Sequence, residues 1–236
     1  MKKIIHRAND RGYADHGWLK SYHSFSFANY WDDKKINFGL LRVLNDDVVK
    51  GGMGFGAHGH DNMEIVSIPL SGALAHKDST GTSEIIQTND VQIMSAGTGI
   101  RHSEFNASET EPVNFLQIWV MPKERNIKPR YDQKTYSQDE RKNKLLTVVS
   151  PEKSDRSLWI NQDSYFSIGS FDSGKTIDYK LKSETNGIYV FLIDGEINIS
   201  ENILTKRDAI GIWDTDSVSI QTGKDTQILI IEIPMN

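Results

Sequence analysis

Short apolar segments separated by turn residues constrain the fold of this chain more than any other feature. The segments are rich in Ile, Val, Phe, Tyr and Trp, and Gly, Asp, Asn, Ser or Thr bound them, as in residues 78–82 and 222–225. Asp194-Gly195 lies between two apolar segments and predicts a tight hairpin, because glycine tolerates the positive φ of such a turn. Many short strands at this spacing are typical of a β-sandwich or barrel, so we expect an all-β fold.

The two halves of the chain resemble each other in the pattern of these segments. Residues 65–76 align with 188–199, and further along residues 87–95 align with 205–213. Each match alone is short, but both occur in the same order. The sequence therefore predicts a duplicated β-barrel.

One long polar segment divides the 236-residue chain roughly in half, and its composition suits a surface linker. The length accommodates two small domains. We therefore expect an N-terminal domain over residues 1–122, a polar linker over residues 123–143 and a C-terminal domain over residues 144–236.

The absence of cysteine limits the chemistry that the chain can perform. It excludes disulfides, thiolate catalysis, iron–sulfur clusters and cysteine-based zinc sites, so a metal site must use imidazole and oxygen ligands. The net charge of −5 gives no support for direct contact with nucleic acid, which needs a basic surface. The N-terminus has no signal-peptide core and no apolar run is long enough to span a membrane. We expect a soluble, cytoplasmic protein that does not contact membranes.

Two pairs of potential metal ligands lie in the N-terminal half. His58 and His60 are two residues apart, as are His102 and Glu104. On a strand this spacing places both side chains on one face, about 7 Å apart. Glu64 has the same parity as His60 and is a rival carboxylate. An isolated His-x-His is common on an exposed loop, but two such pairs beside glycine-rich turns favour a metal site.

This donor set also limits the metal and the compounds that it binds. Three neutral imidazoles and one carboxylate around a divalent ion leave a net charge of about +1 and open coordination positions. Imidazole suits iron, copper, nickel and zinc, and the carboxylate favours iron or manganese. We expect one divalent ion, with Fe2+ preferred and Mn2+, Ni2+, Co2+, Cu2+ and Zn2+ as alternatives. Such a site can bind an ionised enol or phenol together with dioxygen.

The segments around these residues resemble the motifs of a known family. GMGFGAHGHDNMEIVSIPLSG (52–72) is similar to the first cupin motif, and GTGIRHSEFN (97–106) to the end of the second. With the flanking segments 16–32 and 116–131, they resemble the pirin family of bicupins, and most nearly the bacterial pirin-like quercetinases. The resemblance covers nearly the whole chain and is strongest over residues 7–131.

The resemblance implies both a fold and a ligand set. The fold is a bicupin of two tandem, jelly-roll-like cupin barrels, of which the N-terminal one binds the metal. The implied ligands are His58, His60, His102 and Glu104. Glu104 is also the implied general base. Cupins in general use the glutamate of the first motif, so Glu64 remains either the rival ligand or a neighbour of the ligands.

The implied activity is that of a quercetin 2,3-dioxygenase, an oxidoreductase that cleaves a flavonol such as quercetin with O2. We expect a monomer whose partners are a small phenolic substrate and O2. An alternative is a non-catalytic, metal- or redox-sensing pirin-like protein that regulates a protein partner. A third hypothesis is that the chain is a structural double barrel without a metal.

The C-terminal half lacks the residues for a second imidazole site. The internal alignment pairs the four implied ligands, in chain order, with Leu181, Ser183, Ile220 and Thr222. No histidine follows His102. We expect the C-terminal barrel to have a structural role.

The remaining histidines are interpreted as structural. His16 and His23 lie in the aromatic-rich segment 16–32, which we expect to pack as an N-terminal layer. His6 and His76 are expected at the surface or beside the ligands. The side chain of Arg101, next to His102, is expected on the outer face of the strand, where we expect it to form a salt bridge.

Overall fold

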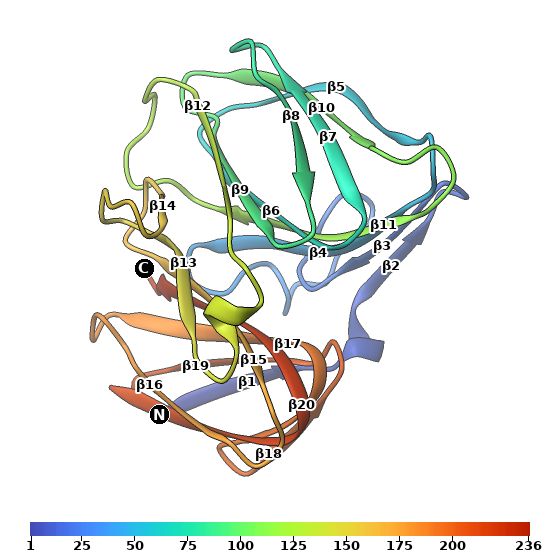
Figure 1. Ribbon diagram of the computed structural model, residues 1–236. Coiled ribbons are helices and arrows are strands. Elements are labelled where there is room, and N and C mark those ends of the chain that lie inside the picture. The colour runs from blue at the N-terminus through green and yellow to red at the C-terminus, as the bar shows by residue number, and fades with distance from the viewer.

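The computed structural model describes all 236 residues, which form β-strands and two short 3-10 helices (Figure 1). The N-terminal half contains β1 (Lys2–His6), η1 (Ala8–Asp10), β2 (Gly12–Asp15), β3 (Leu19–His23), β4 (Leu41–Val49), β5 (Gly54–His60), β6 (Glu64–Ser71), β7 (Ala73–Asp78), β8 (Ser83–Gln87), β9 (Asp90–Ser95), β10 (Ile100–Asn106) and β11 (Val113–Val120). The remainder contains β12 (Arg130–Thr135), η2 (Asp139–Arg141), β13 (Leu146–Ser150), β14 (Leu158–Trp159), β15 (Tyr165–Phe171), β16 (Thr176–Lys180), β17 (Asn186–Ile199), β18 (Asn202–Thr205), β19 (Ala209–Trp213) and β20 (Ser217–Pro234).

Two sheets face each other in the N-terminal half. A seven-stranded sheet has the order β12-β9-β6-β11-β4-β3-β2, and a four-stranded sheet has the order β5-β10-β7-β8. Figure 1 shows the four-stranded sheet at the top of the molecule, above the longer sheet. The expected all-β cupin fold is confirmed, although the sheets form an open, cupin-like sandwich rather than a closed barrel.

The C-terminal half is built around two long, bent strands. β17 and β20 pair antiparallel within a nine-stranded sheet of order β1-β19-β17-β20-β15-β13-β14, with β16 and β18 paired beside this path. The hairpin predicted at Asp194-Gly195 is wrong, because β17 continues through both residues and the ladder shifts register there. Gly195 has a φ of +95°, and a Cβ would overlap the carbonyl oxygen of Asp225. The glycine therefore forms a bulge that bends the strand.

The bend at Gly195 has a counterpart in the first half. Gly72 has a φ of +75° where the chain leaves β6 in one sheet for β7 in the other. The internal alignment places these two glycines on each other. Each half thus uses a glycine with positive φ at the corner where a strand leaves the face between the halves, which supports the predicted duplication.

The spatial division of the chain differs from the expected domain boundaries at two places. β1 pairs antiparallel with β19, so the first strand of the chain completes the C-terminal sheet. β12, within the expected linker 123–143, pairs with β9 at the edge of the seven-stranded sheet. Composition could not predict either of these strand pairings, because the partner strands lie far away in the sequence.

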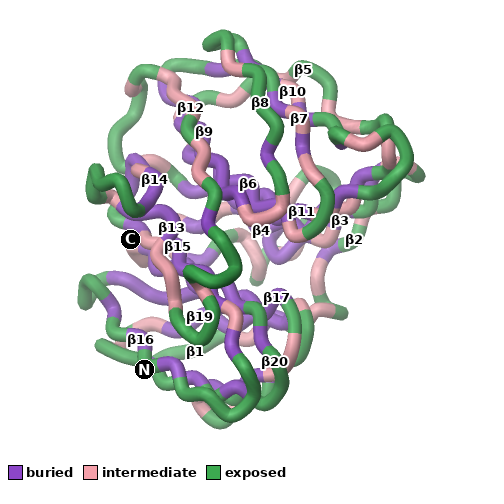
Figure 2. Tube along the Cα trace, in the orientation of Figure 1, coloured by how far each residue is buried: buried purple, intermediate pink, exposed green.

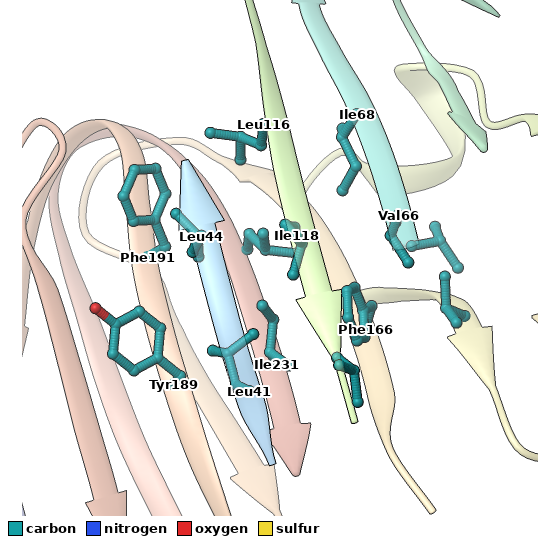
Figure 3. Packing of buried hydrophobic residues seen from close by; sticks show 14 of the residues in the cluster. Leu41, Leu44, Val66, Ile68, Leu116, Ile118, Phe166, Tyr189, Phe191 and Ile231 are labelled. Carbon is teal, nitrogen blue, oxygen red and sulfur yellow. The ribbon is translucent and has the colours of Figure 1, made fainter. Parts of the chain in front are cut away.

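The largest apolar core lies between the two halves. Figure 3 shows its side chains projecting from strands of both sheets into one layer, and Figure 2 shows buried residues concentrated along these strands. Alternation along β11 explains this, since Leu116 and Ile118 join the shared core while Gln117 and Trp119 line a pocket inside the N-terminal half. The same strand therefore holds the halves together and forms part of the pocket wall.

The interiors of the two halves differ in polarity. The C-terminal interior is a cluster of sixteen buried apolar residues that includes Ile188, Val190 and Ile230. The N-terminal interior has smaller apolar clusters, and buried polar side chains lie among them. No helix is long and apolar enough to cross a membrane.

Candidate metal centre and adjoining pocket

Two paired strands bring the predicted histidine ligands together. β5 and β10 are antiparallel neighbours, and His58 lies directly opposite His102. His60 is two residues further along β5, so its side chain shares the face of His58. The ladder shifts register between His102 and Glu104, because β5 carries one extra residue between Phe55 and His58. This bulge lets Phe55 and His58 face the same pocket.

The three imidazoles point their Nε2 atoms at one position. The Nε2 atom of His102 lies 2.9 Å from that of His60 and 3.1 Å from that of His58. The Nδ1–H of His58 donates to the Gly56 carbonyl oxygen at 2.8 Å, which leaves its Nε2 as a lone-pair donor. Two ligand nitrogens at about 2.1 Å from one ion and at right angles lie about 3.0 Å apart. The residues therefore fit a single divalent ion.

The electrostatics of this cluster favour neutral imidazoles. Burial lowers the pKa of His60 to about 4, with a smaller effect from His58. Burial also lowers the pKa of His102 to about 3, again reinforced by the neighbouring histidines. Neutral imidazole is the form that binds a metal, so at neutral pH these two groups release no proton when an ion binds.

Glu104 lies beside the cluster, fully buried on β10. Its Oε2 accepts a 2.8 Å hydrogen bond from Gln117 Nε2, and its Oε1 accepts one of 3.2 Å from Ser67 Oγ. Burial raises the pKa of this carboxyl to about 7. A carboxyl oxygen of Glu104 lies within 4.8 Å of ligand atoms of His102 and His76. It lines the same pocket as His58 and His60 without joining their close cluster.

Glu64 lies outside this group. Its Oε2 accepts hydrogen bonds from Ser95 Oγ at 2.8 Å and from the backbone N–H of Asn161 at 3.1 Å, so it connects the two halves of the chain. The shared parity with His60 does not place it in the pocket, because Asn62 has a φ of 45° and the chain turns between β5 and β6. Alternation holds only within one strand.

A pocket of about 440 Å³ opens from the histidine cluster, and its lining extends beyond the residues that the sequence singled out. Aromatic side chains dominate its apolar part: Tyr13, Phe27, Tyr30, Phe55 and Trp119. Its size falls in the range for small-molecule sites, about 300–1,000 Å³. A lining of aromatic rings with a few polar groups suits a planar aromatic ligand.

The structural interpretation of His16 and His23 is corrected here, because both line the pocket. The aromatic-rich segment 16–32 does not form a separate packed layer. Leu19–His23 of this segment form β3, a strand of the seven-stranded sheet itself, and Phe27 and Tyr30 beyond it line the pocket. Ser21, Asn45 and Asp47, from β3 and β4, also line the pocket and were not anticipated. The only sequence signal was the buried-strand pattern interrupted by polar residues at alternate positions.

The other histidines are buried rather than exposed. His76 Nε2 lies 3.0 Å from Asp78 Oδ2, and its ring contacts that of His102 at a centroid distance of 5.3 Å. His6 is 6% exposed and its Nδ1 lies 2.9 Å from the Tyr189 hydroxyl. Arg101 forms no salt bridge, and instead donates from Nη2 to the Ala57 carbonyl oxygen at 3.0 Å.

The C-terminal half has no corresponding cluster. Ile220 pairs with Ile177, and Val218 with Tyr179, so Ile177 and Tyr179 occupy the ladder positions of His58 and His60. The aligned positions expected from the sequence, Leu181 and Ser183, are wrong because the connection from β16 to β17 is longer than that from β5 to β6. An apolar interior fills the space that the N-terminal half uses as a pocket.

Comparison with known proteins adds independent information on both halves. The family model described as Pirin matches residues 5–120, and the one described as Quercetinase C-terminal cupin domain matches residues 147–233. The chain is 40% identical over 230 residues to quercetin 2,3-dioxygenase of Escherichia coli K12, which covers 98% of each chain. It is 36% identical over 222 residues to a pirin-like protein of Caulobacter vibrioides, covering 94% and 95%.

A solved structure is similar over nearly the whole length. The crystal structure of the bacterial pirin YhhW from Escherichia coli in complex with nickel(II) has a TM-score of 0.93 and 38% sequence identity, covering 99% of each chain.

Proposed function

The chain belongs to the pirin family, and we propose that it is a metal-dependent dioxygenase that cleaves a flavonol such as quercetin with O2. The observation that carries this proposal is the convergence of three imidazole nitrogens, 2.9 and 3.1 Å apart, at the end of an aromatic pocket. The name of the Escherichia coli relative supports the substrate class, and the nickel complex of YhhW supports a divalent ion.

In this proposal His58, His60 and His102 hold the ion, with Glu104 as the fourth ligand. A divalent ion bound there would supply Lewis acidity toward a hydroxyl–carbonyl pair and an open coordination position. The hydrogen bond from His58 Nδ1 to Gly56 fixes one imidazole before any ion arrives. Preorganised ligands of this kind reduce the entropy lost on binding.

Glu104 is also the residue that we propose accepts the proton of the substrate hydroxyl. Ser67 and Gln117 hold its carboxylate in place from the opposite sheet. A carboxylate in this buried position is more basic than one in water, so it accepts a phenolic proton more readily. Both hydrogen bonds also keep the carboxylate from turning away from the pocket.

The aromatic lining would hold the planar ring system against the ion. Trp119 contacts His60 edge to face at a centroid distance of 4.9 Å, and Phe27 contacts Trp119 in the same manner at 5.3 Å. These rings form a continuous apolar wall beside the cluster. They would exclude water from the reacting part of the substrate.

The metal site is tested first by metal content of protein purified without chelators or a His-tag. We expect about one divalent ion in the unaltered protein and a large loss in His102→Ala and Glu104→Gln. Glu64→Gln is the matched comparison for the rival carboxylate and should keep its metal. Retained metal in both His102→Ala and Glu104→Gln would refute the ligand set.

The reaction is tested by incubating the metal-loaded protein with quercetin in the presence and absence of oxygen. We expect oxygen-dependent loss of flavonol absorbance, abolished in Glu104→Gln and unchanged in Glu84→Gln, a control on the exposed face of β8. Loss of absorbance that is independent of oxygen or of Glu104 counts against the proposal. A bound metal without any turnover would instead favour the non-catalytic alternative.

A further inference from the structure

A second group of polar side chains faces the pocket from the sheet opposite the histidines. Ser21 and His23 lie on β3, and Asn45 and Asp47 on β4, in the seven-stranded sheet. The histidine cluster lies on β5 and β10 of the four-stranded sheet, which faces it (Figure 1). All four side chains are nearly inaccessible to bulk water and line the pocket. Two of them, His23 and Asp47, each keep one hydrogen-bond acceptor atom that has no partner within the protein.

His23 presents an unused acceptor to the pocket. Its Nδ1 lies 2.9 Å from Asn45 Oδ1. An amide oxygen has no hydrogen, so the shared hydrogen is on Nδ1, and Nε2 of the neutral ring carries a lone pair. Nε2 forms no hydrogen bond within the protein, although His23 is only 3% exposed. Phe27 and Tyr30 flank the ring at centroid distances of 5.4 and 6.3 Å and hold its orientation.

Asp47 presents a second acceptor when its carboxyl is ionised, and because burial raises the pKa of this carboxyl to about 7, the ionised form prevails above that pH. Its Oδ1 accepts a hydrogen bond from Ser21 Oγ, and Oδ2 has no partner within the protein. The side chain is 4% exposed, so what remains accessible faces the pocket that it lines. Oδ2 is therefore free to accept a hydrogen bond from a group that enters the pocket.

Two unpaired acceptors on one wall define the chemistry of the group that they bind. A hydroxyl donates a hydrogen bond, whereas a carbonyl, an ether oxygen or a carboxylate does not. We propose that His23 and Asp47 form a specificity subsite that binds hydroxyl groups on the pendant ring of the flavonol, away from the ion. The proposal rests on the function proposed above, since it concerns the far end of the same substrate.

The subsite assigns a role to residues that the reaction itself does not use. The fused rings would lie at the histidines, and the pendant ring would extend toward the opposite sheet, between Phe27, Tyr30 and Trp119. His23 and Asp47 would determine which flavonols bind well rather than how fast the bound ring is cleaved. They would contact the substrate without touching its reacting atoms.

The test compares two ligands that differ only on the pendant ring. Quercetin carries hydroxyls there, and a flavonol with an unsubstituted pendant ring carries none. Dissociation constants are measured by fluorescence quenching in oxygen-free buffer, for both metal-free and nickel-loaded protein. We expect quercetin to bind up to about 100-fold more tightly than the unsubstituted flavonol, the combined effect of two hydrogen bonds that each contribute about tenfold.

Two variants test whether His23 and Asp47 cause the tighter binding of quercetin. Asp47→Asn keeps the hydrogen bond from Ser21, and His23→Phe keeps an aromatic ring of similar size. Each should weaken quercetin binding about tenfold while changing the unsubstituted flavonol by less than about twofold. Asp178→Asn, on the exposed side of β16, is the control and should leave both constants unchanged. Thermal denaturation of each variant checks that the fold is retained.

The outcomes separate this inference from the proposed function. Equal binding of the two flavonols, or an equal loss for both in the variants, overturns the subsite even if quercetin is cleaved. A hydroxyl preference that falls about tenfold in each variant supports the subsite even if no cleavage occurs. Because the ligand comparison uses the unaltered protein, the inference can be refuted even if a variant does not fold.

Discussion

Replacing His6 by glutamine should remove a specific part of the acid sensitivity of this protein. His6 ends β1, the strand that crosses to the C-terminal sheet, and it is buried against Tyr189 and Phe25. Burial, with a smaller contribution from Lys35, lowers its pKa from 6.5 to about 4, while Asp32 and Asp10 act in the opposite direction. Folded protein therefore keeps His6 neutral in a range where the unfolded chain protonates it.

The sign and size of the effect follow from these two values. Between pH 6.5 and 4 the unfolded chain binds more protons at this position, so stability is fully present above pH 6.5 and is lost as the pH falls. Linkage gives a loss of about 2 kcal/mol from pH 7 to pH 5 attributable to this one side chain. His6→Gln cannot titrate, so the variant should lack this part of the loss.

Urea denaturation at pH 7 and pH 5, with chelator present, measures the difference. The unaltered protein should lose about 2 kcal/mol more of its unfolding free energy than His6→Gln over this interval. His16→Gln removes an exposed histidine and should retain the full loss. If His6→Gln and the unaltered protein show the same pH dependence, the burial of His6 beside Tyr189 and Phe25 does not perturb this histidine as argued.

Further predictions concern the packing of the halves, the strand bend and the metal. Asp46→Ala leaves two largely buried arginines, Arg11 and Arg207, without their carboxylate partner and should cost about 3–5 kcal/mol of unfolding free energy in urea. A loss below about 1 kcal/mol would contradict a buried ion network. Gly195→Ala should destabilise more than Gly81→Ala when both are measured by thermal melting, because both have positive φ but only the former Cβ meets backbone. Nickel at a hundredfold excess over its dissociation constant should stabilise the protein by about 2.7 kcal/mol, and His58→Ala should greatly reduce this gain at the same nickel concentration. An undiminished nickel response in that variant would exclude His58 as a ligand.

Local patterns were sufficient to predict the fold class, for a physical reason. Strand-forming segments and turn residues are patterns of only a few neighbouring positions, so they can be recognised in a single sequence. The hairpin at Asp194-Gly195 shows the limit of this reasoning. The same glycine conformation serves a turn or a bulge, and the choice depends on whether a long partner strand such as β20 is available to continue the pairing.

For the candidate site too, part of the arrangement follows from local spacing and part from the pairing of distant strands. The spacing of His58 and His60 fixes their common face within a single strand, so the sequence alone predicted that pair, and His102 with Glu104 was predicted by the same rule. Only the tertiary structure could set β5 against β10 and bring the three nitrogens together. The register between strands depends on pairing across the fold rather than on local spacing.

The sequence by itself predicted an all-β, duplicated chain with candidate metal ligands in one half, because periodicity and ligand spacing are local properties. Tertiary structure alone decided that Glu64 joins the two halves, that β1 completes the distant sheet, and that His23 and Asp47 line the pocket. Those outcomes depend on contacts between residues far apart in the chain, and such contacts are set by which faces the packed sheets bury.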